Sequence, residues 1–142
     1  MKNKIVNHTC IPERGLKQFQ SEIETWKRLL QSRIEENVLL KIRLSDILKN
    51  NYDQNWLEEI EVFQSQFIGQ DEIMSLLRKD IANLYDLFTN DLSAKEQIRK
   101  TIERTMMKLH NDMTTSANNF NHLKLAFNNF ENQIYRKNEN WN

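Results

Sequence analysis

Apolar residues recur along most of the chain at alternating spacings of three and four, which is the pattern of helices that bury one face. Three segments carry it, at about 13–49, 55–89 and 94–137, and in each the phase continues across a polar interruption. The pattern therefore predicts three long helices, each with one apolar seam of coiled-coil type. The expected seam residues are Leu16, Phe19, Ile23, Trp26, Leu30, Leu40, Leu44 and Ile47; Trp56, Ile60, Phe63, Phe67, Met74, Leu77, Ile81, Leu84 and Phe88; and Ile102, Met106, Leu109, Met113, Phe120, Leu123, Phe127, Phe130 and Ile134.

Two polar clusters mark the connections between these segments. Residues 50–53 read NNYD, which favours a turn, and Ser93 with Glu96 three residues later forms a capping box. Short connections between long helices make successive helices antiparallel. We therefore expect an all-α fold, an antiparallel up-down-up three-helix bundle of long coiled-coil-like helices.

The chain length and the scarcity of helix-breaking residues favour a single helical bundle. The 142 residues include only two glycines and one proline, too few for a fold with many turns. We expect a flexible N-terminal segment at 1–12, a single three-helix domain at 13–137 and a polar tail at 138–142.

The polar residues that interrupt the seams fall at one predicted level. Arg33 and Asn37 interrupt the first seam, Gln70 the second and Ser116 the third. With turns centred near residues 52 and 92, antiparallel pairing places all four opposite one another. This predicts a central polar layer, with Asp112 as a candidate charge partner for Arg33.

Three interpretations of this layer stay open. Polar residues in a coiled-coil core commonly fix register and oligomeric state at some cost in stability. Alternatively, the first helix rotates locally, so that Ile34 and Val38 turn inward while Arg33 and Asn37 are exposed. The third interpretation is a site at Arg33 for an anion or another small ligand.

Gly69 precedes Gln70 in the stretch FIGQD, within the second seam. Because the apolar phase continues through it, we expect the helix to continue, at a cost of about 1 kcal/mol relative to alanine. The missing side chain would admit a neighbour such as Arg33 or Trp26, or permit a small bend.

Charge is segregated along the chain although the total is zero. The net charge is +4 over residues 1–50, −7 over 51–91 and +3 over 92–142. An acidic middle helix beside two basic helices would be self-complementary. Basic charge that is compensated in this way argues against nucleic-acid binding.

Residues capable of chemistry are few and scattered. The sequence has no glycine-rich phosphate loop, and Cys10 has no partner that would activate it. His8, His110 and His122 lack the spacings of helical metal sites, and His110 with Asp112 is interpreted as a surface pair. A phosphate-accepting role for His122 stays open. We predict a protein that is not an enzyme, with no catalytic residues, cofactor or metal.

Some apolar residues exceed what one bundle can bury, and three of them, Leu39, Ile42 and Leu76, mark a candidate interface. We expect a homo-oligomer, most simply a dimer, or a complex with another helical protein. No apolar run reaches membrane-spanning length and the N-terminus lacks a signal-peptide pattern, so we expect a cytoplasmic protein without membrane contact. The predicted function is a non-enzymatic interaction or scaffolding protein, and the alternative is a ligand-sensing or signalling bundle that uses the polar layer at Arg33 and Gln70.

Overall fold

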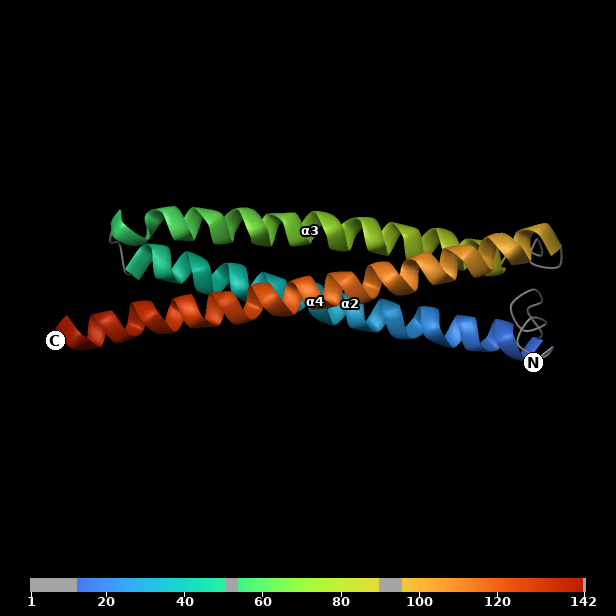
Figure 1. The fold of residues 1–142 in the computed structure, drawn as a ribbon, viewed down its shortest axis with the longest axis horizontal. Helices are drawn as coiled ribbons and strands as arrows, with labels where there is room; N and C mark the ends of the chain where they lie inside the picture. The colour runs from blue at the N-terminus through green and yellow to red at the C-terminus, as the bar shows by residue number, and fades with distance from the viewer. Residues whose placement is uncertain (1–12, 51–53, 90–95, 142) are drawn as a thin grey trace. The chain divides into compact units, whose positions relative to one another are not determined.

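Three long helices account for all the residues that the computed structural model describes (Figure 1). They are α2 (Glu13–Asn50), α3 (Gln54–Thr89) and α4 (Glu96–Trp141). The predicted all-α, up-down-up three-helix fold is confirmed. Helix α4 continues four residues beyond the predicted end, since no glycine or proline occurs there to stop it.

Two helix ends carry a charge that suits the helix dipole. Lys49 lies in the last turn of α2, and Glu96 lies in the first turn of α4. The remainder of the predicted capping box, at 93–95, and the predicted flexible segment at 1–12 lie outside the described residues.

The chain divides into two compact units, each of which contains one segment of every helix. Unit 1 comprises residues 1–31 and 75–114, and unit 2 comprises residues 32–74 and 115–142. Within each unit the three helical segments pack as a bundle. The assignment of 13–137 to one domain stays a prediction.

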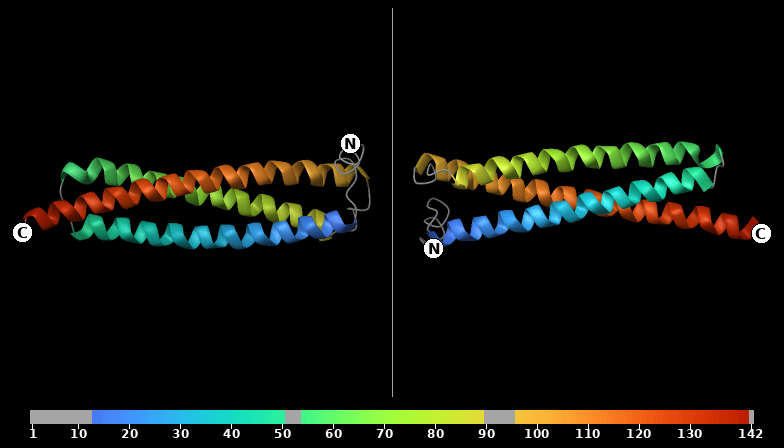
Figure 2. Two further views of the ribbon diagram at one scale, coloured as in Figure 1. Left: turned by 60° about the horizontal axis from the view of Figure 1, so that its bottom comes forward. Right: turned by 180° about the vertical axis from the view of Figure 1, so that it is seen from behind.

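Contacts inside each unit give the helix directions. In unit 1, Phe19 meets Phe88 and Gln31 meets Arg78, so α2 and α3 run antiparallel. In unit 2, the segments of α2 and α4 run parallel (Figure 2). The ion pairs of unit 2 agree with a parallel arrangement: Glu36 pairs with Lys124, and Arg43, seven residues later on α2, pairs with Glu131, seven residues later on α4.

The buried apolar residues are those of the predicted seams. Their burial follows from the heptad spacing, which keeps one face of each helix turned toward the other two. The residues are Ile23, Trp26, Leu30, Leu40, Leu44, Ile47, Ile60, Phe67, Met74, Leu77, Ile81, Leu84, Ile102, Met106, Leu109, Met113, Phe120, Leu123, Phe127, Phe130 and Ile134.

Four predicted seam residues are partly exposed: Phe19, Trp56, Phe63 and Phe88. Phe19, Trp56 and Phe88 lie within seven residues of a helix end, where fewer side chains cover them. The side chain of Leu16 lies outside the described residues.

An aromatic cluster fills part of the unit 2 core. The ring of Phe63 lies 5.4 Å from that of Phe127 and 5.1 Å from that of Phe130, measured between centroids. Phe67 meets Phe127 edge-on at 5.2 Å, and Trp56 meets Phe130 in the same way at 5.6 Å. Such pairs contribute about 0.5 to 1.5 kcal/mol beyond the burial of their area.

Candidate functional site

The polar residues that interrupt the seams gather in unit 2. Asn37, Gln70 and Ser116 are buried, with exposed fractions of 0%, 8% and 5%, and Arg33 is half-buried. Among the described residues, these three are the only buried side chains that are polar or charged. Burial of polar groups is costly unless they are hydrogen-bonded, so their contacts decide what the cluster does.

Asn37 joins α2 to α3. Its side-chain Nδ2 donates to the backbone oxygen of Phe67 at 3.1 Å and to Oδ1 of Asp71 at 2.8 Å. Lys41, one turn later on α2, donates from Nζ to Oδ2 of the same carboxylate at 2.6 Å. Asp71 thus accepts from two residues of α2 and orients the buried amide.

Asp71 and Lys41 were not among the residues predicted for the polar layer. A signal was present, because Asp71 directly follows Gln70 and Lys41 lies four residues after Asn37. Both stand beside the seam, where Lys41 can bury its apolar stem and keep its charged head in water.

Arg33 joins α2 to α4. Its Nη1 donates to Oγ of Ser116 at 3.3 Å, a long hydrogen bond. Burial lowers the pKa of Arg33, and the nearby Glu36 carboxylate opposes that shift. A lowered pKa means that charging Arg33 costs free energy in the folded state. Because arginine stays protonated at all ordinary pH values, this cost does not vary with pH across that range.

Two buried oxygen atoms have no hydrogen-bond partner among the described residues: Oδ1 of Asn37 and Oε1 of Gln70. Each unsatisfied group costs about 1 to 3 kcal/mol. Both atoms are acceptors, so only a group that donates a hydrogen bond would satisfy them. An anion would add further acceptors, which argues against the anion interpretation at these two atoms.

The local-rotation alternative for α2 is wrong. Asn37 is fully buried, whereas Val38 is 44% exposed, the reverse of what that rotation requires. The apolar residues on both sides, Leu30 and Leu40, hold the helix phase through the polar stretch because both are buried.

Asp112 belongs to unit 1, whereas the other members of the predicted layer belong to unit 2. Its Oδ2 accepts from Nζ of Lys108 on the same helix at 2.9 Å. This contact raises the pKa of Lys108. The pairing of Asp112 with Arg33 stays a prediction, since the two residues belong to different units.

Gly69 does not make room for a neighbouring side chain, contrary to the sequence-based expectation. Helix α3 passes through it, as predicted, with no positive φ. A Cβ atom added at Gly69 would meet nothing within 4 Å, so neither Arg33 nor Trp26 fills the space beside it. No packing contact therefore requires glycine at this position.

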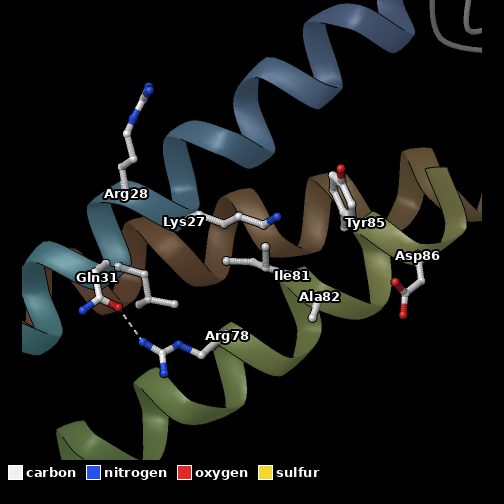
Figure 3. A pocket seen from close by; sticks show the side chains of 9 residues that line it. Lys27, Arg28, Gln31, Arg78, Ile81, Ala82, Tyr85 and Asp86 are labelled. Atoms are coloured by element: carbon white, nitrogen blue, oxygen red, sulfur yellow. Dashed lines mark hydrogen bonds between the residues drawn. The ribbon is translucent and has the colours of Figure 1, made fainter. Parts of the chain in front are cut away.

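A groove of about 490 Å³ lies between α2 and α3 in unit 1 (Figure 3). Its cations already have partners: Arg78 Nη2 donates to Gln31 at 2.6 Å, and Lys27 Nζ lies 3.9 Å from the ring centroid of Tyr85. Figure 3 shows Arg28 pointing away from both. The groove therefore presents no convergent set of free polar groups.

A second groove of unit 1, of about 470 Å³, includes Glu22 and His110. Nδ1 of His110 lies 3.5 Å from Oε1 of Glu22. The predicted surface pair of His110 with Asp112 is wrong, because the two partners are Glu22 and Lys108 respectively. Among the described residues, no three metal-ligating side chains come together.

The predicted interface residues are all exposed. Leu39 and Ile42 of unit 2 are 60% and 51% exposed, and Leu76 of unit 1 is 63% exposed. Within the described ranges, no helix combines the length and apolarity needed to cross a bilayer.

The chain matches no protein-family model, no curated protein and no solved structure.

Proposed function

We propose that this protein is a non-enzymatic helical interaction or scaffolding protein that self-associates. The observation that carries the proposal is an apolar patch on α2 formed by Val38, Leu39 and Ile42, which are 44%, 60% and 51% exposed. The buried seam residues Leu40 and Leu44 lie on the other side of the same helix.

The three residues form one surface because of their spacing. Ile42 lies three residues after Leu39 and four after Val38, the separations at which helical side chains are neighbours. Covering a large apolar side chain contributes about 1.5 to 3 kcal/mol relative to leaving it exposed. A second chain that covered this patch would recover that free energy.

The setting that we propose for this activity is the cytoplasm, since the single cysteine offers no internal disulfide. No catalytic group, cofactor or nucleic-acid partner enters the proposal.

Sedimentation equilibrium over a wide concentration range tests it. The wild type is expected to associate reversibly at micromolar concentrations, and Leu39→Glu is expected to sediment as a monomer. Leu125→Glu is the matched control, because Leu125 is similarly exposed, at 62%, but lies on α4. A wild-type monomer at high micromolar concentration contradicts the proposal.

The two unsatisfied oxygens support a second candidate, a ligand-sensing or signalling bundle. Oδ1 of Asn37 and Oε1 of Gln70 would accept from a small donor that entered the polar layer. Under this proposal, Gln70→Met abolishes ligand-dependent shifts of the melting temperature, because it removes one of the two acceptors. If the layer only fixes register, the same change leaves the protein folded, with an equal or higher melting temperature.

A further inference from the structure

The outer face of α2 in unit 2 has its own order of charged and apolar residues. Glu35, Ile42 and Lys49 are all exposed and follow one another at seven-residue intervals, so they lie along one line of the helix. Val38 and Leu39 flank Ile42 on its N-terminal side. The face therefore has an apolar centre, with Glu35 two turns before it and the exposed Asp46 and Lys49 one and two turns after it.

We propose that this face pairs with the same face of a second copy, with the two α2 helices antiparallel across a two-fold axis at Ile42. This inference rests on the proposed self-association and specifies its geometry. In such an isologous contact, residue i meets residue j and j meets i. Ile42 then faces Ile42 of the second copy, and Glu35 faces Lys49 of the second copy at both ends.

Charge favours this arrangement over two competitors. A parallel pairing would set Glu35 against Glu35 and Lys49 against Lys49. An antiparallel pairing in which Leu39 faces Ile42 would set Glu35 against Asp46. Both competitors juxtapose like charges, whereas the two-fold at Ile42 makes two attractive pairs.

Both charged residues are available for such pairs. In the described part of the chain, neither Glu35 nor Lys49 has an ion-pair partner. The neighbouring cations of α2 are already engaged toward the bundle, Lys41 with Asp71 and Arg43 with Glu131. The outward charges that a second copy would meet are therefore Glu35, Asp46 and Lys49, and the two-fold at Ile42 sets Glu35 opposite Lys49.

A charge swap measured by sedimentation equilibrium tests the geometry. Glu35→Lys and Lys49→Glu are each expected to weaken the dimer, raising its Kd about tenfold or more, because each converts two attractive pairs into two repulsive ones. The double variant Glu35→Lys/Lys49→Glu restores both pairs with reversed signs, and its Kd is expected within about threefold of the wild type. Circular dichroism of each variant checks that the bundle is folded, and Ile42→Lys, which places two cations at the axis, is expected to be a monomer.

Cross-linking tests the direction of pairing independently. In a Cys10→Ser background, a Glu35→Cys chain and a Lys49→Cys chain are mixed and oxidised. The proposal expects a disulfide between a Glu35→Cys chain and a Lys49→Cys chain. Rapid formation of a disulfide between two copies of the Glu35→Cys chain would indicate parallel pairing and overturn the proposal.

The outcomes separate this inference from the proposed function. A wild-type monomer overturns both. A wild-type dimer that the single charge reversals leave unchanged, or that the double variant fails to restore, overturns the two-fold at Ile42 while self-association stands.

Discussion

The two units use the same three-helix architecture but fill their cores differently. Unit 1 is built from aliphatic residues, methionine and Trp26, and every buried polar side chain of the described residues belongs to unit 2. Unit 2 combines those polar groups with a phenylalanine cluster around Phe127. One heptad pattern therefore accommodates either a uniformly apolar core or a core that combines buried polar groups with large aromatic residues.

The largest expected effect compares the two cores directly. Phe127→Ala should lower the free energy of unfolding by about 3 to 5 kcal/mol, because Phe127 is fully buried and packs against Phe63 and Phe67. Leu109→Ala in unit 1 should cost less, about 2 to 4 kcal/mol. Urea denaturation measures both, and an equal or larger loss for Leu109→Ala would show that the aromatic cluster gives unit 2 no advantage.

The next largest expected effect is a gain in stability rather than a loss. Gln70→Met should raise the free energy of unfolding by about 1 to 2 kcal/mol, because it replaces a buried, unsatisfied acceptor with an apolar side chain of similar length. Gln66→Met is the matched exposed control, and it should change stability by no more than about 0.5 kcal/mol. A destabilised Gln70→Met variant would mean that the Gln70 amide is satisfied in solution.

Gly69→Ala should stabilise unit 2 by about 1 kcal/mol, since alanine has the higher helix propensity and its Cβ meets nothing within 4 Å. Ser75→Ala at an exposed position of α3 in unit 1 should gain about half as much. Thermal and urea unfolding of the two variants measure the gain. A loss of stability at Gly69 would reveal a close approach, such as that of a second chain.

The smallest effects concern surface ion pairs. Lys41→Met should lower the free energy of unfolding by about 0.5 to 1 kcal/mol, because Lys41 shares the Asp71 carboxylate with buried Asn37. Lys108→Met, which removes a more exposed pair within one helix, should have a smaller effect. Added salt should reduce the loss at Lys41. Identical losses at both sites would contradict a special role for Asp71.

The direct contacts also revise the expectation from charge segregation. The ion pair between Asp71 and Lys41 joins the acidic helix α3 to the basic helix α2. In unit 2 two further pairs, Lys124 with Glu36 and Arg43 with Glu131, join α2 to α4, both net basic. Net charge by segment therefore did not predict which helices are joined by ion pairs, because individual side-chain positions decide that.

The heptad pattern along the chain is enough to predict the helices, their order and direction, and the apolar residues of the core. It could do so because heptad spacing is a local property: an apolar residue every three or four positions fixes which face of a helix is buried. The burial of Asn37, Gln70 and Ser116 follows from the same phase.

The contacts of the polar groups, in contrast, depend on how the helices pack against one another. The spacing does not reveal that the Asn37 amide donates to Asp71 and to the Phe67 carbonyl. Nor does it reveal that the side-chain oxygens of Asn37 and Gln70 have no hydrogen-bond partner among the described residues, or that Gly69 faces open space. These outcomes depend on side-chain rotamers and on the distance between helices, and both are set by packing across the bundle rather than by periodicity along one helix.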